Sequence, residues 1–425
     1  MKSIELKPII ERLLNIEKVR VKEVEMDEKG NVIIKVVSLE EGTKCKNCGI
    51  EIKEEIGEDE AIRLRHLSIL DHKTYIEIKP KRYVCRNCTN KPTTTQKLEW
   101  YNPRSGQTKA YEKYLMRQLI NSTIEDVSKK EEVGYKAIEA AIEAAIDRNI
   151  SNEVNWEEYE NLHILGLDEI SLKKGHRDFV TIVSSLSREG EVRVLAVLEG
   201  RKKETVEEFL ETIPVKLKKS ILRVCTDLYD GYINAVKKVL PKAKVVADRF
   251  HVAKAYRSCV DDLRKQEMER LKKILPKSEY DELKGAMWVL RKNPHHLQPQ
   301  EQNLLKRLFE LSPKLKHAYQ YREQLSSIFN QKLSKNKALR KINTWKNRVK
   351  KSSLTCFHPF LTTLDNWIDE ITNFFLDRNT SAFVEGLNNK IKVLKRRCFG
   401  IFNLSHLFQR IFLDLLGYNF FASSY

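Results

Sequence analysis

The spacing of hydrophobic positions changes four times along the chain. Apolar residues in residues 1–20 recur at helical spacing. The next stretch, Val21–Val37, alternates apolar and polar side chains around Lys29-Gly30, which predicts two strands joined by a turn. A second alternating run covers residues 63–85. Residues 1–100 therefore predict a small β-rich module.

Helical spacing replaces the alternation in residues 101–155. Ser122 or Thr123 provides an N-cap before an acidic first turn, and Val133-Gly134 provides a tight turn. Two short helices around such a turn predict a helix-turn-helix.

Strands return in residues 156–251. Three of them are expected in succession, at 163–168, 179–186 and 191–198, followed by a helix, a strand at 221–227, a helix and a strand at 243–248. This order is typical of a ribonuclease-H-like core.

The rest of the chain is helical by its spacing. Residues 252–375 are lysine-rich amphipathic segments punctuated by prolines, and we interpret them as a helical insertion. Residues 376–425 predict closing helices of the core. The expected fold class is α/β, with a ribonuclease-H-like catalytic core, a large all-helical insertion, and the β-rich module and helix-turn-helix in front.

Composition and charge narrow the classes of partner. The 425 residues contain no apolar run long enough to span a membrane and no signal-like start, so we expect a cytoplasmic protein. The formal charge is +18, and it is concentrated: residues 311–351 hold twelve basic side chains and one acidic. A polyanion such as double-stranded DNA is the expected partner, although a merely basic surface would give the same total charge.

Four of the eight cysteines form two Cys-x-x-Cys pairs, at Cys45/Cys48 and Cys85/Cys88. Each pair can turn two thiolates toward one ion, so together they predict a tetrahedral structural Zn²⁺ site. Redox-active pairs are the alternative, and the β-rich, basic surroundings favour the metal. His66 and His72 lie between the pairs and are expected to pack without binding the ion.

Two aspartates follow apolar strands in the predicted core. Asp168 and Asp227 would meet at the ends of neighbouring strands, where two carboxylates are costly unless a cation neutralises them. Glu385, on a predicted closing helix, supplies a third carboxylate. Such a triad predicts two Mg²⁺ (or Mn²⁺) ions about 3.5–4 Å apart for phosphodiester chemistry. Asp227 could instead cap the helix that follows it.

Asp248 and His251 end the next predicted strand and are candidates to support this triad from behind. His251 could orient a phosphate or a carboxylate, or simply pack against the insertion. Strand alternation sends Glu169 to the face opposite Asp168, so Asp168 is the better candidate.

These motifs resemble those of the ISL-three insertion-sequence transposases, which are DDE enzymes with an N-terminal zinc-binding module. The resemblance runs from about residue 40 to 415, and its most specific strings are DRFHV and EGLNNKIKVLKRRCFG. It implies that Asp168, Asp227 and Glu385 bind the catalytic metals. It further implies binding to terminal inverted repeats, cleavage that frees 3′-hydroxyls, attack of these on target DNA, and at least a dimer on DNA.

One segment departs from this expectation. The candidate recognition helix, YKAIEAAIEAAIDRN, carries Glu139, Glu143 and Asp147, and an acidic helix is a poor reader of a polyanion. It could form a dimer contact instead, which would leave DNA recognition to the zinc module and its flank, including Lys79. The expected DNA-binding residues are Lys81, Arg82, Arg86, Lys390, Lys392, Lys395, Arg396 and Arg397.

Two other classes of protein share most of these features. A DNA-binding regulator could retain an inert ribonuclease-H-like scaffold, and a structure-selective nuclease would cut without joining strands. End cleavage separates the transposase from the regulator, and strand-transfer products separate it from the nuclease.

Overall fold

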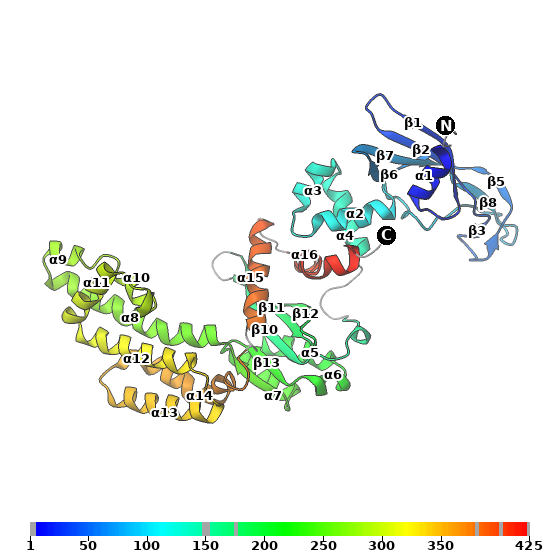
Figure 1. The fold of residues 1–425 in the computed structure, drawn as a ribbon. Helices are drawn as coiled ribbons and strands as arrows, with labels where there is room; N and C mark the ends of the chain where they lie inside the picture. The colour runs from blue at the N-terminus through cyan, green and yellow to red at the C-terminus, as the bar shows by residue number, and fades with distance from the viewer. Residues whose placement is uncertain (1–5, 147–153, 174–176, 379–381, 399–402, 423–425) are drawn as a thin grey trace. The chain divides into compact units, whose positions relative to one another are not determined.

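The computed structural model describes residues 6–146, 154–173, 177–378, 382–398 and 403–422. The chain divides into two units, Met1–Arg148 with Gln409–Tyr425, and Asn149–Phe408. Figure 1 shows the elements of both. Among the described residues, no helix has the length and apolar character needed to cross a bilayer.

The first unit begins with helix α1 (Leu6–Leu14) packed on a four-stranded sheet. The strand order is β1 (Val19–Met26), β2 (Val32–Ser38), β7 (His72–Ile78) and β6 (Ile62–Ile69), with β2 and β7 parallel. Alternation places one apolar face against α1. The predicted turn is present, because Gly30 takes a φ of +77° between β1 and β2.

Two smaller sheets carry the cysteines. One pairs β3 (Thr43–Lys44) with β4 (Glu51–Ile52), and the other orders β5 (Glu55–Glu58), β8 (Lys81–Val84) and β9 (Thr93–Thr95). Their common core is small, so packing alone contributes little to the stability of this region.

Three helices complete the first unit: α2 (Lys109–Leu119), α3 (Ile124–Glu131) and α4 (Tyr135–Ala145). The predicted cap is confirmed, since the Thr123 side chain accepts the backbone N–H of Asp126 at 2.9 Å. Helix α16 (Leu404–Gly417) contributes Leu413 to their shared core. A short π-helical turn, Tyr418–Ala422, follows.

The second unit is built on a five-stranded sheet. Its order is β12 (Val192–Glu199), β11 (Arg177–Leu186), β10 (Ile164–Lys173), β13 (Arg223–Thr226) and β14 (Lys244–Ala247). Strand β11 pairs antiparallel with both β12 and β10, whereas β13 and β14 run parallel to β10. This mixed α/β arrangement fits the predicted ribonuclease-H-like core.

One strand is longer than predicted. Strand β10 continues through Asp168 to Lys173, because β11 keeps pairing with it, whereas its parallel pairing with β13 ends at Leu167 and Thr226. Asp168 therefore lies where the parallel part of the sheet stops, not at the end of a strand. A 3₁₀ turn at Trp156–Glu158 precedes β10. The later strands are connected by helices α5 (Lys203–Thr212), α6 (Val215–Ser220) and α7 (Asp230–Val239).

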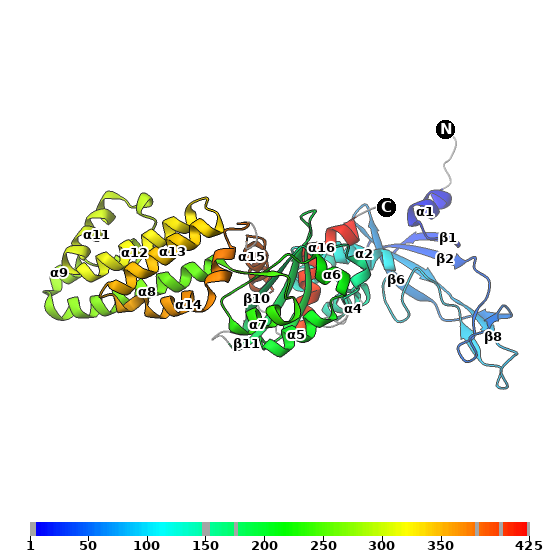
Figure 2. The same cartoon turned by 90° about the horizontal axis from the view of Figure 1, so that it is seen from below.

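Helices α8 to α14 pack side by side around a large apolar core that includes Tyr256, Phe329, Trp345 and Phe360 (Figure 2). The prolines predicted to interrupt this region lie at the starts of helices. The backbone N–H that proline lacks has no hydrogen-bond partner within the helix at these positions. The helices are α8 (Arg249–Ile274), α9 (Lys277–Asp281), α10 (Ala286–Arg291), α11 (Pro299–Leu311), α12 (Pro313–Asn330), α13 (Lys335–Lys351) and α14 (His358–Asn373), with 3₁₀ turns at Pro294–His296 and Thr355–Phe357.

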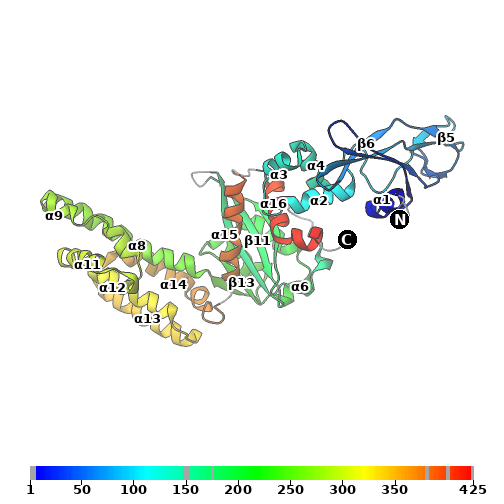
Figure 3. The same ribbon diagram turned by 45° about the horizontal axis from the view of Figure 1, so that its top comes forward.

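The chain returns to the sheet after this bundle. Asn373, the last residue of α14, donates a side-chain hydrogen bond of 2.7 Å to the carbonyl of Val245 in β14. Helix α15 (Ala382–Arg397) then contacts β10. Figure 3 shows α15 against the sheet that contains β11 and β13.

Candidate functional site

Three aspartates gather where the parallel part of the five-stranded sheet stops: Asp168 lies within β10, and Asp227 and Asp248 directly follow β13 and β14. Leu167 pairs with Thr226 in the parallel register, so the next residues, Asp168 and Asp227, lie side by side where this pairing stops. Asp248 follows β14 and donates its backbone N–H to the carbonyl of Thr226 at 2.8 Å. The topology thus gathers three carboxylates from segments that are far apart in sequence.

Asp227 is the carboxylate whose charge is least compensated. Its Oδ1 is buried and has no hydrogen-bond partner among the described residues. Burial, reinforced by nearby Asp168, raises the pKa of Asp227 to about 6, against the opposing effect of His251. The helix-capping alternative is wrong, because the N-cap of α7 is Tyr229 and the helix starts at Asp230. A buried, unpartnered carboxylate oxygen suits a divalent cation.

Asp168 has partners on both oxygens. Oδ1 accepts the backbone N–H of Glu169 at 2.8 Å, and Oδ2 accepts the side-chain amide of Asn388. Burial raises the pKa of Asp168, while the Glu169 N–H, His251 and Lys392 lower it. Glu169 itself forms an ion pair of 3.1 Å with Arg201. The pair Asp168 and Asp227 can share one proton or one cation more easily than carry two bare charges.

Helix α15 can approach β10 because Gly166 has no side chain. A Cβ at this position would lie 2.6 Å from both Val384 Cγ2 and Ser184 Oγ. The close approach brings Asn388 onto Asp168. Sequence reasoning missed Asn388, although it stands three residues after Glu385 and hence on the same helical face.

Glu385 is exposed in the first turn of α15. Its charge contributes to raising the pKa of Asp248, after burial and Asp168, so it faces the same edge of the sheet. Within the described residues, however, only the cysteines form a group of three or more potential ligands whose donor atoms all lie within 4.8 Å of one another. The predicted triad is therefore a neighbourhood of carboxylates, not a closed ligand shell.

Asp248 and His251 occupy the start of α8. Asp248 is 7% exposed and caps the helix, with Oδ1 accepting the Phe250 N–H at 2.9 Å. His251 is half-buried, and its charge lowers the pKa of Asp168, Asp227 and Asp248 alike. One imidazole thus faces all three aspartates.

The four cysteines converge as predicted. Cys85 Sγ lies 3.7 Å from Cys48 Sγ and 3.8 Å from Cys88 Sγ, and all four sulfurs fit within 4.8 Å. Backbone N–H groups of Cys48 and Asn47 lower the pKa of Cys45 to about 6, whereas hydrogen bonding to Cys48 and then burial raise that of Cys88 to about 12. Four thiolates cannot be this close without a cation, and the all-sulfur donor set suits Zn²⁺.

The two intervening histidines take other roles. His66 is buried and its Nδ1 lies 2.9 Å from Thr108 Oγ1, while burial lowers its pKa to about 4. The exposed His72 donates from Nδ1 to the Gly30 carbonyl at 2.9 Å. Among the described residues, the group of potential ligands around the cysteines consists of the four cysteines alone.

The basic side chains predicted to bind DNA differ in their exposure and in their contacts within the protein. Lys395 donates to the carbonyl of Ser171 in β10, whereas Lys390, Lys392 and Arg396 are exposed on α15. Arg397 is half-buried on the same helix. In the zinc module, Lys81 and Arg86 form ion pairs with Glu55 and Glu54, and Arg82 donates to Thr93 Oγ1 at 2.9 Å.

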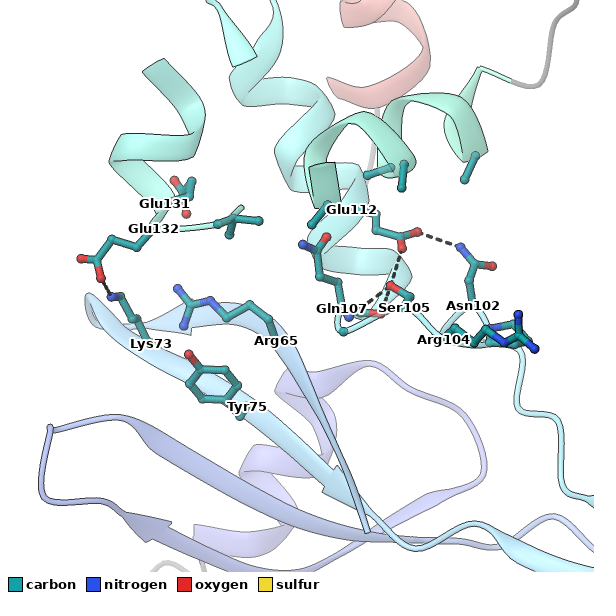
Figure 4. A pocket seen from close by; sticks show the side chains of 17 residues that line it. Arg65, Lys73, Tyr75, Asn102, Arg104, Ser105, Gln107, Glu112, Glu131 and Glu132 are labelled. Atoms are coloured by element: carbon teal, nitrogen blue, oxygen red, sulfur yellow. Dashed lines mark hydrogen bonds and ion pairs between the residues drawn. The ribbon is translucent and has the colours of Figure 1, made fainter. Parts of the chain in front are cut away.

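A cavity of about 410 Å³ lies between the four-stranded sheet and helices α3 and α4 (Figure 4). Arg65 is 7% exposed, and its Nη1 has no partner among the described residues. The cavity wall is nevertheless balanced in charge. Its three cations, Arg65, Lys73 and Arg104, are matched by three carboxylates, Glu112, Glu131 and Glu132, so charge does not select a polyanion here.

Comparisons with known proteins found matches along most of the chain. A family model described as "Transposase" matches residues 165–411, and a second, "Helix-turn-helix domain of transposase family ISL3", matches residues 96–146. The transposase for insertion sequence element IS1001 of Bordetella parapertussis is 26% identical over 369 residues, covering 86% of this chain and 87% of that protein. The corresponding transposase of element IS1557 from Mycobacterium tuberculosis is 24% identical over 402 residues, covering 88% and 86%.

A solved structure, the Drosophila P element transposase strand transfer complex, aligns with 74% of this chain and 94% of its own. The TM-score is 0.41 and the sequence identity 11%. The predicted helix-turn-helix is confirmed by its family model.

Proposed function

Because this chain belongs to the ISL3 family of transposases, we propose that it binds the terminal inverted repeats of its insertion sequence, cuts the DNA at the 3′ ends, and joins those ends to target DNA. The first step consumes water and breaks a phosphodiester bond, leaving a 3′-hydroxyl. In the second, that hydroxyl attacks a target phosphodiester and displaces another 3′-oxygen. The net number of phosphodiester bonds is unchanged in the joining step.

The observation that carries this proposal is the carboxylate neighbourhood where the parallel pairing of β10 with β13 stops. Asp168, Asp227 and Glu385 would hold two Mg²⁺ or Mn²⁺ ions, and the unpartnered Oδ1 of Asp227 is the oxygen that most lacks a counter-charge. The chemistry that two such ions supply when bound is activation of the attacking oxygen and stabilisation of the leaving one.

The chain's own residues orient this centre. Asn388 fixes one oxygen of Asp168, which leaves the carboxylate a defined direction. His251 faces all three aspartates and can hold the scissile phosphate or Asp248 in place. Lys392, exposed on α15 and close enough to lower the pKa of Asp168, can bind a neighbouring phosphate.

The other parts of the chain would position the DNA. We assign residues 1–100 to a zinc-binding module, 101–155 to the helix-turn-helix, 156–251 and 376–425 to the catalytic core, and 252–375 to a helical insertion. One Zn²⁺ on Cys45, Cys48, Cys85 and Cys88 would hold the strands that carry Lys81, Arg82 and Arg86. Because two transposon ends must be joined, at least a dimer forms on DNA.

The test uses DNA from the two flanks of the encoding gene, since a transposase acts on its own borders. With Mg²⁺, wild-type protein should nick these ends, and Asp168→Asn should lower the rate roughly a thousandfold or more without weakening binding. Asp230→Asn, an exposed acid on the first turn of α7, is the matched control and should cut normally.

Three outcomes would contradict parts of this proposal. Wild-type protein that binds the ends but never nicks them favours the regulator. Nicking without strand-transfer products favours the nuclease. Normal cleavage by Asp168→Asn would place the active centre elsewhere.

A further inference from the structure

A groove of about 370 Å³ runs beside the first turns of α8. Phe250, Lys254, Arg257 and Asp261 lie along one face of this helix, at intervals of three or four residues. Leu290, Arg291 and Arg322, from α10 and α12, line the other side. The groove belongs to the second unit, and its lining begins at Phe250 in the first turn of α8, next in sequence to His251.

Phe250 joins the groove to the carboxylate centre. Its backbone N–H donates to Asp248, and its ring meets that of His251 edge-on with centroids 5.6 Å apart. Despite this, the Phe250 side chain is 54% exposed. A large aromatic side chain left in water beside charged groups costs free energy that burial against a ligand would recover.

The groove carries a surplus of positive charge. Lys254 and Arg257 are exposed, and no described carboxylate lies within ion-pairing distance of either. Asp261, the acid in the lining, already pairs with Arg264 and Arg291. Arg322 is buried and donates to the Leu290 carbonyl. Unlike the cavity of Figure 4, this surface selects an anion.

We propose that this groove binds the DNA strand adjoining the scissile phosphate, with one unpaired base stacked on Phe250 and backbone phosphates on Lys254 and Arg257. An aromatic platform followed by a cationic track is the combination that binds single-stranded nucleic acid. A paired base in a duplex has its faces covered by its neighbours, so Phe250 can stack only on a base that has left the helix. Phe250 is thus a positioning residue, and the inference rests on the proposed function.

The first test measures unstacking at single positions. Duplexes from the flanks of the encoding gene carry 2-aminopurine at one nucleotide near the cleavage site, a different one in each duplex. Binding of the full chain without divalent metal should raise the fluorescence at one position several-fold. Phe250→Ala should lose this signal, and Phe250→Tyr should restore it. Trp288→Ala removes another exposed aromatic of the helical bundle, outside the groove, and should behave as wild type.

The second test measures phosphate binding and cleavage. The double variant Lys254→Ala, Arg257→Ala should lower the salt dependence of binding by roughly 0.7 to 0.9 in log–log slope for each phosphate that is no longer neutralised. Lys272→Ala, exposed further along α8, is the control. With Mg²⁺, Phe250→Ala should cut about tenfold more slowly or worse, and a mismatch at the signalling position should recover most of that rate.

The outcomes separate this inference from the function it builds on. If wild-type protein cuts the flanks and Phe250→Ala cuts at the same rate with the same 2-aminopurine signal, the groove is not the strand site and the transposase proposal stands. If wild-type protein shows the position-specific signal but never cuts with Mg²⁺, the groove binds DNA and the catalytic proposal fails. A signal at no position overturns the stacking.

Discussion

Asp227, a proposed metal ligand, lowers the free energy of unfolding of the metal-free chain when it is ionised. Burial raises its pKa to about 6, well above that of an unfolded aspartate. Between about pH 4 and 6 the metal-free folded chain keeps a proton that the unfolded chain has released, so the free energy of unfolding falls as pH rises through this range. At neutral pH the ionised group then destabilises the fold by up to about 3 kcal/mol.

We therefore expect Asp227→Asn to raise the melting temperature in EDTA near neutral pH and to flatten its fall between about pH 4 and 6. Mg²⁺ should stabilise the wild type and not the variant, because the carboxylate that binds it is gone. Thermal melts with and without Mg²⁺ measure both effects, and Asp230→Asn serves as the control. An equal Mg²⁺ stabilisation of Asp227→Asn would remove this residue from the proposed metal site.

Single residues were predictable where the local pattern alone marks them. An acid directly after an apolar strand identifies Asp168 and Asp227, and the paired spacing identifies the four cysteines. Asn388 carries no such mark, because its role depends on how closely α15 approaches β10. The same holds for Phe250, whose exposure follows from what packs around the start of α8.

At the scale of elements, Gly166 controls the contact between helix and strand that aligns the site. The added methyl of Gly166→Ala would meet Val384 and Ser184 at 2.6 Å, so α15 must shift and carry Glu385 and Asn388 with it. We expect a destabilisation of about 1–3 kcal/mol and end cleavage slowed roughly a hundredfold. DNA-binding affinity and single-turnover rates measure this, and Val384→Ala in the same chain should recover part of the rate. Cleavage at the wild-type rate would contradict it.

We expect the zinc module to depend on its bound metal for folding. Its apolar core is small, so we expect Cys45→Ser to lose the metal and unfold the region around β3, β4, β5, β8 and β9. Zinc content per purified chain should fall from about one to near zero. Cys356→Ser, a half-buried cysteine of the second unit, should keep its zinc. Unchanged zinc in Cys45→Ser would rule out this cysteine as a ligand.

Element types were more predictable than their limits. The periodicity gave the order of strands and helices in the sheet, and Thr123 and the prolines fixed helix starts. The extension of β10 past Asp168 was not predictable, because it depends on β11 continuing to pair through Ile170 and Val180. The hydrophobic pattern of one strand does not predict how long its neighbouring strand is.

At the scale of the molecule, the grouping of the two chain ends lay beyond sequence reasoning. Leu413 enters the core of α2 and α4, and Asp414 accepts the backbone N–H of Asn121 at 3.0 Å. Such packing depends on long-range geometry, whereas the concentration of charge is visible in the composition. The distribution of charge therefore leads to a prediction about DNA binding, since the sequence shows where basic residues concentrate and the structure shows which of them are exposed.

Helix α13 lies within the most basic stretch of the chain, and Lys337, Arg340 and Arg348 are exposed on it. Reversing all three to glutamate should weaken binding to the flanking DNA and lower its salt-dependence slope by roughly 0.9 for each phosphate left without its cation, while cleavage at saturating DNA stays unchanged. The control reverses three exposed lysines outside this stretch and changes the net charge equally: Lys216, Lys219 and Lys242. Because long-range attraction depends on total charge but counterion release depends on direct binding, an equal weakening in both triple variants would show that α13 attracts DNA only at a distance.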